Sequence, residues 1–468
     1  MMLRLSLLII LLLPNFAFAT DFNGAVLSLY WGIPFLGILF SIALLPMICS
    51  DVWHQHFGKI SLGWTVLFLL PFSYYFGLDQ CLHIMIHAIF KEFVPFILLL
   101  LALFTVSGGI VISGDLVGSP KRNTILLAIG TLLASIMGTT GAAMLLIRPL
   151  IRANQHRQHQ THIIIFFIFL VANIGGGLTP LGDPPLFIGF LNGIDFFWTI
   201  KMMGLPVIIS AVMLLAIFYS IDYCYAQKEQ HKLTHQNWQK TTKIYIEGKI
   251  NIALLIAIIG SVFFTGIWST AQSVTIWATV IPLTTIIQSS LLIAITVISL
   301  YLTPQQFRQK NHFTWEPIIE VSKLFIGIFI TIAPVLMILK AGKNGVLAPL
   351  VALVSDANQQ PINIMYFWLT GTLSSFLDNA PTYLVFFNLA SGEPGTLMTT
   401  KANTLLAISM GSVFMGALTY IGNAPNFMIK SIALQHKIVM PNFLSYMKWS
   451  IIILMPIFIL LSLLFFGN

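Results

Sequence analysis

The chain has 468 residues, of which 57% are hydrophobic and only 8% are charged. Soluble domains carry about 25% charged residues, so this composition excludes a soluble globular protein and indicates a polytopic membrane protein. The formal net charge of +8 does not indicate nucleic acid binding. The basic residues gather in short loops, where they report orientation in the membrane.

The first 19 residues have the features of a cleavable signal peptide. Arg4 precedes an apolar run from Leu5 to Leu13, and Ala17-Phe18-Ala19 is a small-residue cleavage site. The alternative is an uncleaved first helix. Cleavage would leave the N-terminus in the periplasm. We expect the protein itself in the inner membrane.

Residues 20–225 are predicted to form a first structural half, which begins with three crossings of the membrane. We expect these crossings at Leu27–Ile48, Leu62–Phe76 and Phe93–Ser113. His54, His56 and Lys59 are expected in the loop between the first two crossings.

The segment Cys81–Glu92 mixes titratable and apolar residues, which favours a separate helix lying at the membrane interface. His83 and His87 are four residues apart and could bind a metal ion, but no third ligand stands at a metal-site spacing. The three cysteines, Cys49, Cys81 and Cys224, are scattered and indicate neither a metal site nor a disulfide framework.

The apolar segment 123–154 is interrupted at Gly138-Thr139-Thr140-Gly141. Basic residues flank it on both sides, at Lys121 and Arg122 and again from Arg148 onward. A full crossing would place one basic cluster outside, against the positive-inside rule. We therefore predict a re-entrant hairpin with its tip at residues 138–141. The alternative is one crossing helix with a glycine kink.

The next crossing, Thr161–Asn192, contains seven glycines and prolines between residues 175 and 185. That density breaks a helix, and broken backbone at membrane depth is tolerated only where it is buried in protein or lines a wet cavity. Asp183 lies inside the break, and an ionisable residue in a membrane segment is a candidate functional residue. Pro206–Tyr223 is expected to cross back.

Residues 226–249 are polar and basic and are predicted to be a cytoplasmic linker, and residues 250–468 are predicted to form a second half. The residues Thr270–Gln288 are ambiguous, and Trp315–Lys323 resembles a second interfacial helix. Further crossings are expected at Ile250–Trp268, Ser289–Leu302, Leu324–Leu339, Thr404–Lys430 and Phe443–Phe466.

The break around Asp183 is echoed later in the chain. Leu178-Thr179-Pro180-Leu181-Gly182-Asp183-Pro184-Pro185 is matched by Leu418-Thr419-Tyr420-Ile421-Gly422-Asn423-Ala424-Pro425. A second predicted hairpin, Asn363–Ala390, is interrupted at Asp378–Thr382. Gly138 precedes Asp183 by 45 residues, and Asp378 precedes Asn423 by 45 residues.

Paired interruptions in two halves are a feature of secondary transporters built from repeats. With an odd number of crossings in each half, the halves would be inverted. We predict an all-α polytopic membrane protein of two inverted repeats. Each repeat has about five transmembrane helices and one re-entrant hairpin, with broken helices at the midplane.

Where the four interruptions meet, half-helix N-termini and unwound carbonyl groups would line a site for a hard cation such as Na⁺. A cation and a proton would compete there for Asp183 and Asp378, which we predict as the sodium ligands. The alternative is that each aspartate only caps a half-helix. The candidate cation- or substrate-binding residues are Thr139, Thr140, Thr179, Gly182, Asp183, Asp378, Asn379, Thr382, Thr419, Gly422 and Asn423.

No lysine or arginine falls within any interruption, so a tricarboxylate such as citrate would meet two carboxylates and no fixed positive side chain. This favours a cation as the transported species. No metalloprotease, nucleophile-elbow or Cys-His motif indicates an enzyme, and no cofactor other than the transported or coupling Na⁺ and H⁺ is expected. Broken helices in two repeats favour a transporter with alternating access over a channel.

These motifs resemble the ion-transporter superfamily of secondary transporters. Ser374–Thr382 resembles the hairpin of its antiporter branch, and Leu178–Pro185 and Leu418–Pro425 resemble its broken helices. The nearest resemblance is to the bacterial group described as both sodium:proton antiporter and citrate transporter. Gly138–Gly141 and Asp378 depart from the hairpins of the carboxylate carriers.

The resemblance implies a scaffold and a mobile transport region in a homodimer that works by an elevator-like displacement. It also implies two cation sites, one with Thr139, Thr140, Thr179 and Asp183 and the other with Asp378, Asn379, Thr419 and Asn423. We therefore expect a sodium/proton antiporter in contact with the lipid bilayer. The alternative is a sodium- or proton-coupled citrate or carboxylate transporter.

Overall fold

The computed structural model describes residues 24–467, except 115–116, 231–244, 269–271, 278, 343–344, 357 and 359. Helices dominate this part of the chain, and its strands form only two short antiparallel pairs. The predicted all-α class is therefore confirmed. The predicted signal peptide, residues 1–19, lies outside the described residues.

The first half begins with two short 3-10 turns and ends with the longest helix. Its elements are η1 (Gly24–Val26), η2 (Leu29–Gly32), α2 (Ile33–Ile48), α3 (Ser50–Phe76), α4 (Leu78–His87), the π-helix η3 (Ala88–Phe93), α5 (Val94–Ser107), β1 (Val111–Ser113), α6 (Pro120–Met137), α7 (Thr139–Ala153), α8 (Thr161–Leu170), η4 (Ile174–Gly177), α9 (Pro184–Leu191) and α10 (Phe196–Gln230).

Two predictions for this half are wrong. His54, His56 and Lys59 lie within α3 and not in a loop, because the chain turns at Cys49 and is helical from the next residue onward. The predicted interfacial helix is not separate either. Helix α4 continues through η3 into α5 as one apolar helix, Leu78–Ser107, of 30 residues. Pro95 lies inside this continuous helix, directly after the π-helical segment.

Helices α6 and α7 pack against each other and form a hairpin. Gly138, between them, has a φ of 79°, a left-handed conformation that favours glycine. At the other end, the Gly118 amide donates to the Ala153 carbonyl at 2.6 Å. The side-chain amides of Asn123 and Asn154 bond to each other in both directions at 2.9 Å. The two ends of the segment therefore lie together, which rules out one kinked helix.

A buried ionic cluster holds the open end of this hairpin. Arg157 donates to Asp222 at 2.8 Å and to Glu229 at 2.5 Å, and the His162 ring lies 2.9 Å from Asp222. Asn123 also donates to Asp222 at 2.9 Å. The cluster thus fixes the base of the hairpin to α8 and α10.

The second half, like the first, contains a helical hairpin followed by a broken helix, and its elements follow in chain order. They are β2 (Tyr245–Glu247), α11 (Ile250–Ile267), β3 (Ser273–Ile276), β4 (Thr279–Pro282), α12 (Leu283–Leu302), α13 (Gln305–Lys310), α14 (Glu316–Lys340), α15 (Ala348–Leu353), α16 (Asn363–Phe376), α17 (Asn379–Ala390), α18 (Pro394–Met398), α19 (Ala402–Met415), η6 (Gly416–Leu418), α20 (Ala424–Gln435) and α21 (Phe443–Phe466).

Three further boundaries differ from the sequence-based expectations. The ambiguous segment Thr270–Gln288 contains the β3–β4 hairpin and the first turns of α12. Trp315–Lys323 is not a separate interfacial helix, since α14 is continuous. Helix α10 extends to Gln230, into the predicted linker 226–249, and β2 at the end of that linker pairs with β1. Residues 231–244 of the linker lie outside the described residues.

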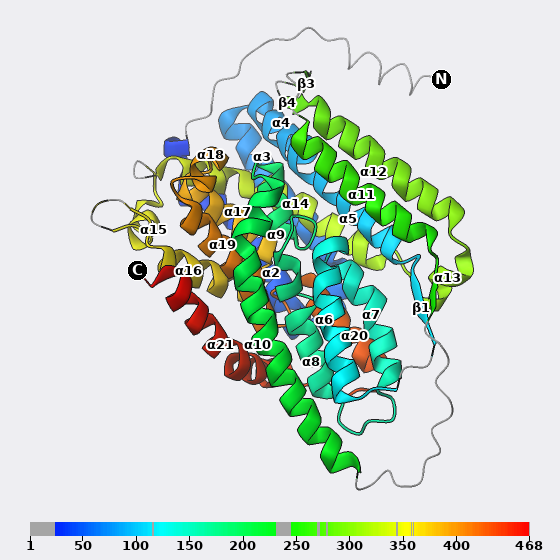
Figure 1. Cartoon of the computed structure of the whole chain (residues 1–468). Coiled ribbons are helices and arrows are strands. Elements are labelled where there is room, and N and C mark those ends of the chain that lie inside the picture. The colour runs from blue at the N-terminus through cyan, green and yellow to red at the C-terminus, as the bar shows by residue number, and fades with distance from the viewer. Residues whose placement is uncertain are drawn as a thin grey trace.

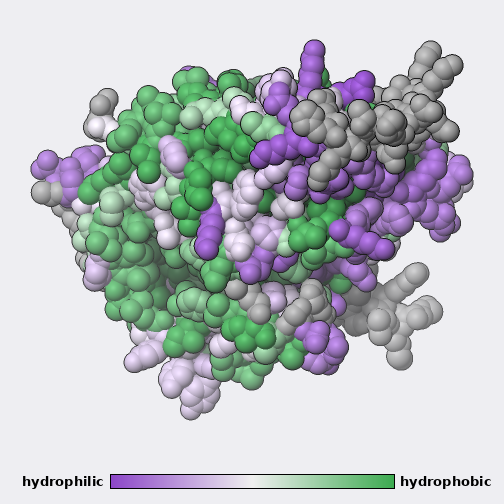
Figure 2. Space-filling view, turned by 90° about the horizontal axis from the view of Figure 1, so that it is seen from below, coloured by the Kyte–Doolittle hydropathy of each residue, from purple (hydrophilic) through white to green (hydrophobic). Residues whose placement is uncertain are grey.

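Seven helices in the described part of the chain are long and apolar enough to cross a membrane. Figure 1 shows α5, α11 and α12 side by side, and α5 also packs against α7, which belongs to the group that contains α6, α8 and α20. The face drawn in Figure 2 combines broad hydrophobic areas with hydrophilic side chains gathered mainly toward one side. Many large apolar residues are exposed, as expected for a multi-pass membrane protein in contact with lipid.

Candidate functional site

The four interruptions of the helices converge on Asp183. This residue is the N-cap of α9 and is 2% exposed. Its carboxylate accepts hydrogen bonds from Thr139 at the tip of the first hairpin, Asn379 at the tip of the second, and Asn423 in the second break. One carboxylate therefore connects the hairpin tips and broken helices of both halves.

The first hairpin and the first break contact each other directly. The Thr139 hydroxyl donates to Asp183 Oδ1 at 3.1 Å, and the Thr139 amide donates to the Gly182 carbonyl at 2.9 Å. The interruption at Gly138 exposes this amide, because it stands at the start of α7 and has no partner one turn earlier. Hairpin and break therefore fit together through groups that a continuous helix would not offer.

The second half contributes two amide side chains. Asn379 Nδ2 donates to Asp183 Oδ2, and Asn423 Nδ2 lies 3.1 Å from Asp183 Oδ1 and 2.9 Å from the Ala172 carbonyl. Both side chains are buried, at 0% and 2% exposure. The structure thus places these two asparagines, which we assigned to a second cation site, beside Asp183.

Two predicted threonines fix the breaks to the hairpins in the same way in each half. Thr179 donates to the Ser135 carbonyl at 2.5 Å, and Thr419 donates to the Ser375 carbonyl. Each hydroxyl also accepts a hydrogen bond from the backbone amide two residues later. These threonines shape the breaks, and their hydroxyl groups are already engaged with backbone.

The predicted glycines are required by close backbone approach. A Cβ on Gly182 would lie 2.2 Å from the Gly176 carbonyl oxygen, and a Cβ on Gly422 would lie 2.6 Å from the Gly416 oxygen. Any side chain at either position would push apart the two sides of the break. The matched geometry also shows that the two breaks are folded alike.

The remaining predicted residues lie beside the cluster without joining it. Asp378 is 9% exposed, and its Oδ1 accepts from the Ala380 amide at 3.1 Å as the N-cap of α17. The Thr382 hydroxyl donates to the Asp378 carbonyl at 2.9 Å within the same helix. Thr140, in the first turn of α7, is half-buried. Asp378 thus acts as a helix cap in this conformation.

Two asparagines that the sequence analysis did not single out link the two breaks. Asn173 Nδ2 donates to Asn426 Oδ1 at 2.8 Å, and Asn426 Nδ2 donates to the Gly416 and Thr419 carbonyls, both at 2.9 Å. Both side chains are 0% exposed. The available signal was their position: each is a polar residue close to a break inside an apolar segment.

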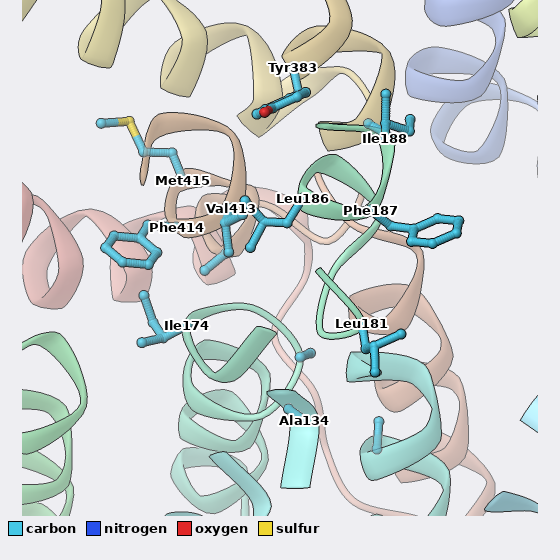
Figure 3. Packing of buried hydrophobic residues seen from close by; sticks show 14 of the residues in the cluster. Ala134, Ile174, Leu181, Leu186, Phe187, Ile188, Tyr383, Val413, Phe414 and Met415 are labelled. Atoms are coloured by element: carbon cyan, nitrogen blue, oxygen red, sulfur yellow. The ribbon is translucent and has the colours of Figure 1, made fainter. Parts of the chain in front are cut away.

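The surroundings of the cluster are apolar and close-packed. Figure 3 shows Leu181, Leu186 and Ile188 on the first break and α9, with Val413 and Phe414 of α19 packed nearby. All five side chains are less than 5% exposed. In such surroundings a charge at Asp183 is weakly screened, so its hydrogen-bond donors and any bound cation or proton matter strongly.

Four helices begin at the cluster. They are α7, α9, α17 and α20, which start at Thr139, Pro184, Asn379 and Ala424. Helix N-termini carry partial positive charge, which stabilises an anion. These N-termini and the three side-chain donors offset part of the cost of burying a charge at Asp183.

One oxygen at the cluster has no hydrogen-bond donor. Asn379 Oδ1 is buried, and the described residues offer it no partner. An amide oxygen and a carboxylate are ligands that hard cations use. The described residues contain no group of three or more His, Cys, Asp or Glu side chains that could hold a metal ion. The donor set therefore fits an oxygen-coordinated alkali cation better than a transition metal.

Comparison with protein families gives one result for the whole chain. Residues 24–466 match the model of a family described as "Putative citrate transport". The chain belongs to this family. The match extends over both halves, including both hairpins and both breaks, so the protein is a multi-pass membrane protein and a secondary transporter. No curated protein matches the chain.

Proposed function

We propose that this member of the citrate transport family is a sodium/proton antiporter in which Na⁺ and H⁺ compete for Asp183. The observation that carries the proposal is that one buried carboxylate receives hydrogen bonds from three other interruptions, in both halves of the chain. The hydrogen bonds to this carboxylate depend on how the two halves are arranged. Cation binding there would couple to movement of the hairpins.

Exchange follows from competition for the same oxygens. With Na⁺ bound, Asp183 is ionised, and rotation of the Asn379 amide would turn its unpaired oxygen toward the cation. With H⁺ bound, the carboxyl group is neutral and can donate a hydrogen bond. Alternating access of the site to the two sides of the inner membrane, by an elevator-like movement, would then exchange one ion for the other.

The test uses purified protein in liposomes with a pH-sensitive dye. We expect Na⁺ or Li⁺ addition to release protons across the membrane with the wild-type protein. For Asp183→Asn we expect the flux to fall by about tenfold or more, because the amide cannot exchange a proton for a cation. Wild-type vesicles without cation-driven proton flux would refute the proposal.

A cation-coupled citrate carrier is the second candidate, and two observations favour it. The family is described by citrate transport. The four helix N-termini at the cluster could also stabilise an anionic substrate without a lysine or arginine. Uptake of radiolabelled citrate driven by a Na⁺ gradient, in the same vesicles and without cation-driven proton flux, would favour this candidate over antiport.

A further inference from the structure

Glu92 is a half-buried residue with a carboxylate that the proposed mechanism does not yet use. It lies in the middle of the continuous apolar helix Leu78–Ser107. Its Oε2 is buried, and no described residue gives it a hydrogen bond. An ionisable residue at such a position is costly unless it serves a function.

The backbone around Glu92 is also unusual. Residues Ala88–Phe93 form a π-helix between two α-helices. Single π-turns inserted in α-helices are rare and occur frequently at functional sites. Because π-helical bonds connect residues five apart, this turn brings His87 and Glu92 toward the same side of the helix.

The second half has neither feature at the corresponding place. Helix α14 takes the place of α4, η3 and α5 in the order of elements, and it is α-helical throughout. Ile332 stands 240 residues after Glu92, the same separation as between Asp183 and Asn423. The π-turn and its carboxylate therefore belong to the first half alone.

Titratable groups lead from Glu92 to the start of the helix. The rings of His83 and His87 have centroids 6.4 Å apart, and both side chains are half-buried. Lys91, on the same element, and Lys340, at the end of α14, are the cations that act on both His87 and Glu92. The described residues contain no group of three His, Cys, Asp or Glu side chains that could hold a metal ion. Glu92, His87 and His83 therefore suit a proton better than a metal ion.

On its other side Glu92 reaches the first broken helix. Its carboxylate lies near Asn192, the C-cap of α9, whose N-cap is Asp183. Helix α9 has eight residues and is therefore about 12 Å long. Glu92 and Asp183 thus stand near opposite ends of one short helix.

We propose that Glu92, with His87 and His83, forms the proton path between Asp183 and the outer end of α4. The proton that Asp183 releases when Na⁺ binds passes to Glu92 through water that enters when the site opens to this side, then to the two histidines and to solvent. When the exchange runs in the opposite direction, a proton enters from the same side and passes these groups in reverse order. This inference rests on the proposed antiport at Asp183.

The test separates proton transfer from sodium binding. Glu92→Gln and His87→Gln are compared with Asp79→Asn, which removes an exposed carboxylate near the start of α4. Each purified variant is placed in liposomes, and two rates are measured: Na⁺-driven proton flux with a pH dye, and exchange of ²²Na⁺ for Na⁺. We expect Glu92→Gln to lose proton flux by about tenfold while Na⁺/Na⁺ exchange stays near the wild-type rate.

His87→Gln is expected to give a smaller loss of proton flux, and Asp79→Asn none. Wild-type proton flux in Glu92→Gln would overturn the inference, as would equal loss of both rates in a variant whose gel-filtration profile is unchanged. Asp183→Asn, measured in parallel, is expected to lose both rates. If it keeps both, the proposed function fails, and that result is distinct from any result with Glu92.

Discussion

At the scale of single residues, aspartates at the two hairpin–break pairs have different roles. Asp183 bonds to side chains from three other interruptions, whereas Asp378 caps its own helix through the Ala380 amide. Corresponding positions in the two halves are 240 residues apart. Asn423 in the second half therefore corresponds to Asp183 in the first, and Asp378 in the second half corresponds to Gly138 in the first. The charge at the cluster therefore comes from the first break.

This difference predicts contrasting effects of one substitution. Asparagine caps a helix about as well as aspartate, so Asp378→Asn should keep near-normal proton flux, and Asp378→Ala should cost about 1 kcal/mol of stability. Flux in proteoliposomes and thermal unfolding in detergent measure the two effects. If Asp378→Asn lost proton flux but kept normal stability, Asp378 would bind the ion and would not act only as a helix cap.

The sequence predicted the residues that repeat better than those that do not. Asp183, Asn379 and Asn423 stand in matching motifs, and an acidic residue among glycines in an apolar segment has few structural explanations. Glu92 was missed as a candidate functional residue because Lys91 beside it and two nearby histidines made the segment resemble an interfacial helix. Only the π-turn and the packing of α14 against it show that its Oε2 is buried.

At the scale of elements, the breaks depend on backbone contact that excludes side chains. Gly182→Ala and Gly422→Ala would place a methyl group 2.2 Å and 2.6 Å from a carbonyl oxygen. Each should destabilise the protein by about 1–3 kcal/mol and reduce transport.

Gly204 in α10 offers a matched control for these substitutions, because a Cβ there meets nothing within 4 Å. Gly204→Ala should be neutral or slightly stabilising, since alanine favours a helix interior. Thermal unfolding of the purified variants measures the difference. Equal stability of Gly182→Ala and Gly204→Ala would contradict the close approach of the backbone at the break.

The α6–α7 hairpin makes a prediction about sidedness. Lys121 and Gln155 are exposed and flank its two ends. In a variant without the native cysteines, single cysteines at these two positions should react with a membrane-impermeant reagent from the same side of the membrane. Reaction from opposite sides would mean that the segment crosses fully.

Element boundaries were predicted well where glycine or proline interrupts an apolar run, as at Gly138, Pro184 and Ala424-Pro425. They were wrong where polar residues were taken as the ends of helices. Helix α3 continues through His56 and Lys59, and α14 continues through Lys323. Polar residues that a helix tolerates give no signal for its end, because only tertiary packing decides whether the chain turns there.

At the scale of the whole molecule, convergence on one carboxylate predicts the stoichiometry of binding. We expect one Na⁺ per chain in the wild-type protein and in Asp378→Asn, and none in Asp183→Asn. The apparent dissociation constant should rise by up to about tenfold per pH unit as the pH falls, because protons compete for the same group. Equilibrium binding of ²²Na⁺ at several pH values measures both. Two ions per chain would contradict a shared site.

The matched spacing of the breaks also shows how a doubled framework can hold an asymmetric centre. Two identical halves would present the same chemistry to both faces of the membrane. Here the charge at the centre depends on one exchange of carboxylate for amide, Asp183 against Asn423. Moving the acid from one member of this pair to the other, in the double variant Asp183→Asn with Asn423→Asp, would keep the composition of the centre and reverse its polarity.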